Sequence, residues 1–172
     1  MVLNEDKLVA YVDGSYYHNK KTYGFGCILL RSNGSKEVEC GSSNNPEAAK
    51  IRNVAGEIAG AMFAIDYAIN QGFKRIEVFY DYNGIEMWAT KKWRANNKFV
   101  KEYVDFINQC SKYIEIEFTK VKGHSNNIFN DMADEYANYA IENNVAMPKL
   151  KSPASIYQTK QKPMALFAKG GV

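Results

Sequence analysis

Three short segments near the start of the chain carry the hydrophobic patterns of β-strands. Residues 7–16 and 23–31 hold apolar runs, and residues 36–42 alternate valine and cysteine with glutamate. The turn-forming stretches HNKKT and SNGS separate these segments, and short turns of this kind join antiparallel neighbours. We therefore expect a meander of three antiparallel strands.

The later part of the chain alternates helical and strand patterns. Apolar residues recur every three or four positions over 53–71 and stop before Gly72, which is typical of an amphipathic helix. Further elements are expected in this order: a strand at 75–80, helices at 83–89 and 99–110, a strand at 113–121 and a helix at 129–142. This β-β-β-α-β-α-α-β-α order predicts an α/β fold with a mixed sheet and helices on its faces.

Composition divides the chain into a domain and a tail. The 172 residues are 46% hydrophobic, enough for one globular domain, which we place at 1–147. Residues 148–172 contain five lysines and no acid, so we expect a basic, flexible tail. The domain then holds 17 basic and 19 acidic residues, so its total charge does not indicate a strongly basic nucleic-acid binder.

Two classes of protein are disfavoured by what the sequence lacks. No run of 18 apolar residues is present and the first ten residues do not resemble a secretory signal, so we expect a soluble, cytoplasmic protein without a membrane partner. Cys27, Cys40 and Cys110 are odd in number and form no C-x-x-C pair. They indicate reduced structural thiols rather than a disulfide framework or a zinc site.

Two aspartates follow the two most apolar strand segments. Asp13 comes after LVAYV and Asp81 after IEVFY. Functional groups gather at strand ends in open α/β sheets, and neighbouring carboxylates repel each other unless protons or cations intervene. Taken alone, either aspartate would be interpreted as a turn or helix-cap residue.

A glutamate in the long helical segment changes that interpretation. Small residues continue the helix side of Glu57, namely Gly60, Ala61, Ala64 and Ala68. Such residues let a helix pack closely on a sheet, so Glu57 is expected to face the sheet. An ionised, unpaired glutamate is costly to bury. Glu57 therefore needs a proton or a metal ion.

A fourth acid lies in the stretch KVKGHSNNIFNDMADEYA. His124 lies in its glycine-containing loop and Asp134 in the first turns of the last helix, where the helix dipole alone could explain an acid. Together, four carboxylates and one histidine on separate elements favour Mg²⁺ or Mn²⁺ over zinc. Such clusters hold two ions about 3.5–4 Å apart and catalyse phosphoryl displacement. The sequence therefore predicts a phosphodiesterase.

The chain resembles the type I ribonuclease H family from about Leu8 to Ile141. The motifs that carry the resemblance are YVDGS with Asp13, AGEIAGA with Glu57, FYDYNGI with Asp81, and VKGHSNNIFNDMADEYA with His124 and Asp134. Their order agrees with the expected elements. The resemblance implies a ribonuclease H-like fold, in which three antiparallel strands and then two parallel strands form a five-stranded mixed sheet with helices on both faces.

The resemblance also implies an activity. It is endonucleolytic cleavage of the RNA strand of an RNA–DNA hybrid, with two Mg²⁺ or Mn²⁺ ions, leaving 5′-phosphate and 3′-hydroxyl ends. By this analogy Asp13 would bridge both ions, and Glu57 and Asp81 would complete the ion beside the leaving group. Asp134 would hold the ion that presents the water. His124 would assist proton transfer or product departure.

Six further residues are candidate contacts to the hybrid, namely Gly14, Ser15, Asn53, Trp93, Lys122 and Asn130. The first three would face the 2′-hydroxyls, or they are turn and cap residues. Trp93 lies in the basic and aromatic stretch WATKKWRANNK, which suits phosphates of the DNA strand or forms a solvated corner. Asn130 stands where the family often has an asparagine.

The chain departs from the family pattern at two places near the acids. Asn53 is followed by Val54, Ala55 and Gly56, so the arginine that many members carry just before the glutamate is missing. Tyr82 follows Asp81 where serine is common. Contacts to the substrate are therefore expected to differ in detail from those of other members.

We expect a monomer whose partner is the hybrid duplex. In the tail, PMALF at 163–167 resembles the short peptide by which bacterial replication proteins bind the sliding clamp, although chance matches to so short a peptide are common and a disordered end with two apolar residues is the favoured explanation. Two other functions stay open. One is a related two-metal DNA nuclease, such as a junction resolvase or integrase core, and the other is a non-catalytic hybrid-binding module.

Overall fold

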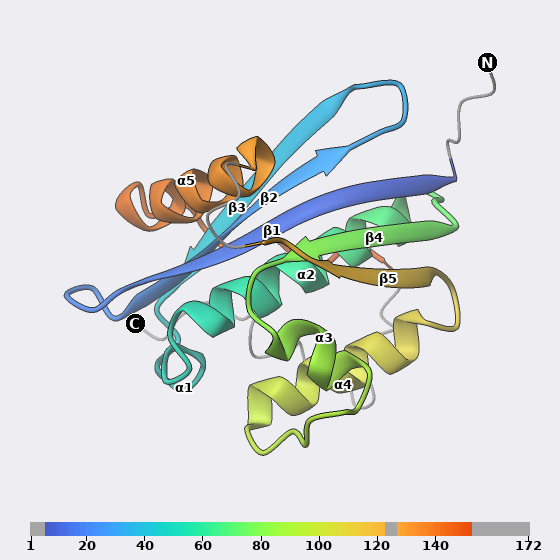
Figure 1. Ribbon diagram of the computed structural model, residues 1–172. Helices are drawn as coiled ribbons and strands as arrows, with labels where there is room; N and C mark the ends of the chain where they lie inside the picture. The colour runs from blue at the N-terminus through green and yellow to red at the C-terminus, as the bar shows by residue number, and fades with distance from the viewer. Residues whose placement is uncertain (1–5, 123–126, 153–172) are drawn as a thin grey trace.

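A five-stranded mixed sheet forms the centre of the computed structural model, which describes residues 6–122 and 127–152 (Figure 1). Its strands are β1 (Lys7–Tyr17), β2 (Thr22–Leu30), β3 (Lys36–Ser43), β4 (Arg75–Tyr80) and β5 (Glu115–Lys120). They are ordered β3-β2-β1-β4-β5 across the sheet. The β1–β2 and β2–β3 pairs are antiparallel, whereas β4 is parallel to β1 and β5 to β4. The predicted sheet is confirmed.

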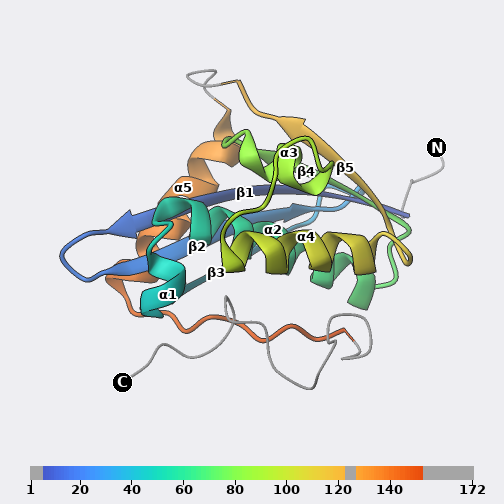
Figure 2. The same ribbon diagram turned by 90° about the horizontal axis from the view of Figure 1, so that it is seen from below.

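Helices cover both faces of this sheet, as expected. They are α1 (Pro46–Ala49), α2 (Asn53–Asn70), α3 (Gly84–Ala89), α4 (Lys98–Cys110) and α5 (Ile128–Glu142). The helix α2 packs on β1, β2 and β4, and α3 and α4 lie on the same side. The helix α5 packs on β1, β2 and β3 from the opposite side (Figures 1 and 2).

One helix was not expected from the sequence, although the other predicted elements are present with ends within two residues. The helix α1 spans four residues, too few for a hydrophobic period to be recognised. Local chemistry accounts for it, because Pro46 occupies the first turn and the Asn45 side chain accepts hydrogen bonds from the backbone N–H groups of Glu47 and Ala48.

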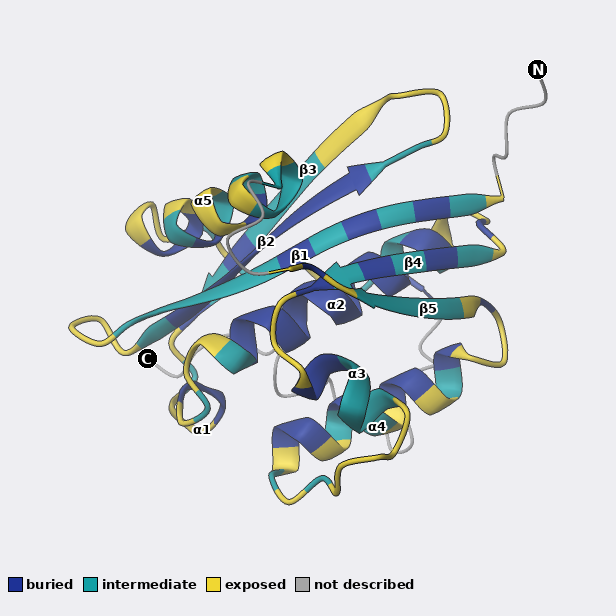
Figure 3. Ribbon diagram, in the orientation of Figure 1, coloured by how far each residue is buried: buried dark blue, intermediate teal, exposed yellow. Residues whose placement is uncertain are grey.

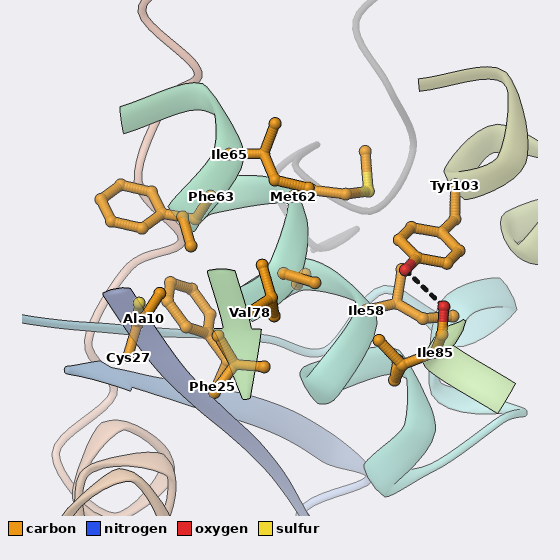
Figure 4. Packing of buried hydrophobic residues seen from close by; sticks show 14 of the residues in the cluster. Ala10, Phe25, Cys27, Ile58, Met62, Phe63, Ile65, Val78, Ile85 and Tyr103 are labelled. Carbon is orange, nitrogen blue, oxygen red and sulfur yellow. Dashed lines mark hydrogen bonds between the residues drawn. The ribbon is translucent and has the colours of Figure 1, made fainter. Parts of the chain in front are cut away.

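The hydrophobic core lies mainly between the sheet and α2 (Figure 3). Every second residue of the first half of β1 is buried, and α2 is buried almost all round because α4 covers its outer side. Figure 4 shows Ile58 and Met62 of α2 beside the Tyr103 ring of α4. The Tyr103 hydroxyl donates a 2.7 Å hydrogen bond to the Ile85 carbonyl, which satisfies this polar group inside the core.

Residues 145–152, which we name the C-terminal strap, lie against β3 and α2 (Figure 2). The Ser42 backbone N–H donates to the Val145 carbonyl at 2.8 Å. The backbone N–H groups of Lys151 and Ser152 donate to the buried Asp66 carboxylate at 2.9 and 3.0 Å.

The strap includes residues 148–152, which the sequence had placed in the flexible tail. These five residues are instead held to the domain, because the Asp66 carboxylate needs hydrogen-bond donors in the interior. The rest of the predicted tail, 153–172, lies outside the described residues, as does the PMALF stretch at 163–167. Within the described part of the chain, every helix is too short or too polar to cross a bilayer.

Candidate active site

The strand β1 continues past the end of its parallel neighbour β4, and this creates an open edge in the middle of the sheet. The last pair between the two strands is Tyr11 with Phe79, whereas β1 runs on to Tyr17. Asp13 lies in this extension and is paired only with Gly26 of β2 on the other side. The carboxyl ends of parallel strands are the usual place for binding sites in such sheets.

A backbone contact between β1 and α2 brings a second acid to this edge. A Cβ atom on Gly14 would fall on the Asn53 carbonyl oxygen and the Glu57 backbone nitrogen, and one on Gly56 would fall on the Gly24 carbonyl oxygen. Only glycine permits this approach. The first turns of α2 therefore lie directly on the strands, and Glu57 is part of this contact through its backbone nitrogen.

Glu57 is almost completely buried, with 2% of its surface exposed, and it is bonded to the end of β4. Its Oε1 atom accepts hydrogen bonds from the backbone N–H groups of Asp81, at 2.8 Å, and Tyr82, at 3.2 Å. Both bonds use the same oxygen. The turn that carries Asp81 is thus fixed against α2, and the two carboxylates belong to one local unit.

Asp81 and Asp134 complete the set from the end of β4 and from α5. Both residues are exposed, unlike Glu57. Asp134 lies in the second turn of α5, whose first turn is capped by the Asn127 side chain accepting from the N–H groups of Phe129 and Asn130. Because α5 and α2 cover opposite faces, Asp134 approaches from the other side of the sheet.

The four acids influence one another electrostatically. Burial is the main cause that raises the pKa of Asp13 to about 8, and the negative charges of Glu57, Asp134 and Asp81 act in the same direction. Burial also raises the pKa of Glu57 to about 7, against the effect of its two backbone hydrogen bonds. The charges of the other three acids therefore act on Asp13, and the carboxylates repel one another in the absence of a cation.

The donor set fits a hard divalent cation. It consists of carboxylate oxygens, and burial together with neighbouring negative charges raises the pKa values of Asp13 and Glu57. A bound cation has the opposite effect on such carboxyls. Among the described residues no three acidic, histidine or cysteine side chains already form a closed ligand group. The acids are thus near enough to repel one another, and the ligand geometry of an ion is not preformed.

Two predicted substrate residues on β1 have partners within the protein. The backbone of Gly14 lies against α2, as described above, and its N–H donates to Asp13 Oδ1 at 2.9 Å. The Ser15 hydroxyl donates to Asn138 Oδ1 of α5 at 2.6 Å. Asn138 was not singled out from the sequence. Its position four residues after Asp134, on the same helix face, was the available signal.

Trp93 belongs to an exposed aromatic group beside Asp81. Its ring centroid lies 6.4 Å from that of Tyr82 and 6.0 Å from that of Trp88, both in edge-on geometry. Trp93 is 41% exposed and Tyr82 37% exposed. The group therefore presents aromatic surface that begins one residue after Asp81 in the chain, and the exposed Lys92 adds a positive charge next to Trp93 in the chain.

The remaining predicted substrate residues lie around the same end of the sheet. Asn53 is the exposed first residue of α2, and Lys122 is exposed just after β5. Asn130 lies one helical turn before Asp134, and its Oδ1 is buried without a hydrogen-bond partner among the described residues. His124 lies outside the described residues, so its predicted role stays a prediction.

Comparison with known proteins agrees with this fold. Solved structures that match include RNase H1 from the halophilic archaeon Halobacterium salinarum, at 22% identity and a TM-score of 0.64, covering 80% of this chain and 98% of that one. Another is LC11-RNase H1 in complex with an RNA/DNA hybrid, at 15% identity and a TM-score of 0.61, covering 78% and 99%. At these identities the likeness concerns the fold.

Sequence comparison carries the assignment to a family. The chain is 29% identical over 150 residues to the ribonuclease H of Chlorobium phaeobacteroides, with 81% of this chain and 99% of the relative covered. It is 29% identical over 139 residues to that of Ehrlichia ruminantium, covering 77% and 92%. The family model for RNase H matches residues 5–142. Since this match spans most of the chain, including all four acids, the chain belongs to the ribonuclease H family of enzymes.

Proposed function

We propose that this protein is an endonuclease that cuts the RNA strand of RNA–DNA hybrids with two Mg²⁺ or Mn²⁺ ions, leaving 5′-phosphate and 3′-hydroxyl ends. The observation that carries the proposal is the convergence of acids from β1, α2, β4 and α5 on the edge beside β1, where three of them raise the pKa of Asp13. The ribonuclease H names of the relatives and the hybrid bound to LC11-RNase H1 support the choice of substrate.

The ions would supply an activated water and stabilise the leaving oxygen. The protein's part is to hold the ligands. Glu57 and Asp81 are fixed to each other through the Glu57–Asp81 backbone hydrogen bond, so we assign them to one ion. Asp134 approaches from the opposite face on α5 and is assigned to the other. Asp13, which the other three acids influence, is assigned to both.

The same end of the sheet would receive the duplex. Asn53 at the start of α2 would approach the RNA strand, and Trp93 with its aromatic neighbours would provide stacking and packing surface for the DNA strand; the exposure of Trp93 supports this assignment. The exposed Lys122 adds positive charge near the end of β5. We further propose that the enzyme acts as a monomer.

The direct test compares cleavage of an RNA–DNA hybrid, duplex DNA and duplex RNA of one sequence, with Mg²⁺, with Mn²⁺ and with EDTA. We expect cuts in the hybrid RNA alone, abolished by EDTA, with ends that T4 polynucleotide kinase labels only after phosphatase treatment. Cleavage of duplex DNA would instead indicate a resolvase-like nuclease. Binding of the hybrid without any cleavage would indicate a non-catalytic module.

A further inference from the structure

A hydrogen bond joins α5 to β1 next to the acidic cluster. The Ser15 hydroxyl donates to Asn138 Oδ1 at 2.6 Å, across 123 positions of sequence. Ser15 lies two residues after Asp13 on the same face of β1, and Asn138 lies four residues after Asp134 on the same side of α5. The Ser15–Asn138 bond therefore lies next to Asp13 and Asp134, two residues further along β1 and one helical turn further along α5.

A second hydrogen bond continues the series. The Tyr17 hydroxyl donates to Glu142 Oε1 at 2.5 Å, two residues further along β1 and four residues further along α5. Two strand residues advance about 6.6 Å and four helical residues about 6 Å, so successive pairs stay opposite each other. Two residues before Ser15 on β1 and four residues before Asn138 on α5, the same spacing sets Asp13 opposite Asp134. This agrees with the effect of Asp134 on the pKa of Asp13.

The distance between α5 and the sheet is also fixed near Asp13. Gly26 is the cross-strand partner of Asp13. A Cβ atom on Gly26 would fall on the Ala133 carbonyl oxygen, one residue before Asp134. The backbone of α5 thus rests directly on β2, and this contact sets its distance from the sheet. The Ser15–Asn138 and Tyr17–Glu142 hydrogen bonds both oppose sliding of α5 along the strand, and Ser15–Asn138 is the nearer of the two to the acids.

We propose that Ser15 and Asn138 are positioning residues that hold Asp134 opposite Asp13 and so set the affinity of this pair of acids for a divalent cation. The inference rests on the proposed function, because it concerns the same metal site. It assigns Ser15 a role through α5, in place of the contact with RNA that its sequence position indicates.

The test measures Mn²⁺ binding without nucleic acid, by electron paramagnetic resonance of free Mn²⁺. We expect Ser15→Ala and Asn138→Ala each to weaken Mn²⁺ binding about threefold to tenfold, the effect of one lost hydrogen bond. The double variant should be no weaker than either single one, because both remove the same bond. Ser15→Thr keeps the hydroxyl and should restore the affinity, and it keeps the test open if Ser15→Ala folds poorly.

Thr119→Ala is the matched control. It removes the 2.6 Å hydrogen bond from the Thr119 hydroxyl to Glu77 Oε2, which joins β5 to β4 away from the acids. Mn²⁺ affinity should not change in this variant. Circular dichroism and thermal melting of all variants establish that the fold is kept.

Binding of the hybrid in EDTA separates the two roles of Ser15. Positioning predicts unchanged hybrid affinity in both variants. Weaker hybrid binding by Ser15→Ala alone, with normal Mn²⁺ affinity, would overturn the inference in favour of an RNA contact. Normal Mn²⁺ affinity in both variants would also overturn it while leaving the proposed function intact. A wild-type protein that neither binds Mn²⁺ nor cuts the hybrid would overturn both.

Discussion

Asp13 occupies a position that is unfavourable for its own negative charge. It is partly buried, and burial together with the charges of three other carboxylates raises its pKa to about 8, against the effect of the hydrogen bond that it accepts from the Gly14 N–H. A group in such surroundings is either protonated or matched by a cation. In the metal-free protein the ionised form of Asp13 is therefore unfavourable, and this single residue already indicates a cation site.

The first prediction concerns catalysis by this residue. Asp13→Asn keeps the size of the side chain but removes the charge that both ions are proposed to share. We expect hybrid cleavage to fall at least about 1000-fold, equivalent to about 4 kcal/mol of activation free energy. Hybrid binding, measured by fluorescence anisotropy in EDTA, should stay within about twofold of wild type. Cleavage near the wild-type rate would contradict the shared role of Asp13.

The second prediction concerns pH and the stability of the metal-free protein. The pKa of Asp13 is about 8 when folded against a usual 3.8, and that of Glu57 is about 7 against 4.5. Between these values the folded protein binds more protons than the unfolded chain, so the free energy of unfolding falls as pH rises from about 4 to 8. Urea denaturation in EDTA at several pH values measures this slope.

Asp13→Asn provides the comparison for that slope, since it removes one of the two titrating groups. We expect a flatter pH dependence and higher stability than wild type at pH 8, by on the order of 1 kcal/mol. If the free energy of unfolding of the wild-type protein instead rises with pH over this range, the ionised forms of Asp13 and Glu57 are not unfavourable in the folded state, and the prediction is wrong.

At the scale of elements, the helix α2 contacts both the acidic site and the C-terminal strap. Its first turns lie on β1 and carry Glu57. Its last turns carry Asp66, which is 1% exposed and accepts hydrogen bonds from the backbone N–H groups of Lys151 and Ser152. The strap that follows α5 is thus attached to the helix on the opposite face of the sheet.

The third prediction follows from this attachment. Asp66→Ala leaves the Lys151 and Ser152 N–H groups without their acceptor, and we expect the free energy of unfolding to fall by about 2–4 kcal/mol. Glu47→Ala is the control, because it removes only the exposed ion pair with Lys50, worth at most about 1 kcal/mol. Equal stabilities in urea would show that the strap does not contribute to folding.

The attachment also predicts what Asp66→Ala does not do. Since Asp66 is hydrogen-bonded to the strap and lies nine residues after Glu57 on α2, cleavage of hybrid at 25 °C should stay within about threefold of wild type. A larger loss at a temperature where the variant is fully folded would mean that the strap acts on the site through α2 or α5.

At the scale of the whole molecule, the site joins elements that contact one another little. The helices α2 and α5 lie on opposite faces of the sheet, and their acids meet only at the edge where β4 ends and β1 continues. A cation bound there would link both faces. Binding should therefore stabilise the folded chain as a unit.

The fourth prediction is the size of that stabilisation. A ligand at 100 times its Kd adds about 2.7 kcal/mol to the free energy of unfolding, equivalent to a rise in Tm of roughly 5–11 °C for a domain of this size. Differential scanning calorimetry with Mn²⁺, with EDTA and with matched ionic strength measures it. The same Mn²⁺ concentration should shift Asp13→Asn much less. A shift of equal size in both proteins would place the cation elsewhere.

Most of the architecture could be predicted from the pattern of the chain, and the exceptions have physical causes. The period of apolar residues over 53–71 and 75–80 reports burial directly, so α2 and β4 were predicted closely. The four-residue α1 has no measurable period. The attachment of residues 148–152 to the domain was not predicted. It is made by backbone N–H groups that donate to Asp66, and every non-proline residue has such a group, so the composition of the segment does not reveal it.

The sequence by itself determined the order of the elements and which of them carry the acids, because these depend on residues close together in the chain; Asp13, expected near a strand end, lies inside β1 where its parallel neighbour β4 has ended. The tertiary structure decided how those acids are arranged. It placed Asp134 opposite Asp13 and gave Ser15 the partner Asn138, 123 positions away. Such contacts depend on the depth and register of α5 on the sheet, and the close packing of Gly24 and Gly26 against the backbone of Ala133 and Ala137 fixes that depth.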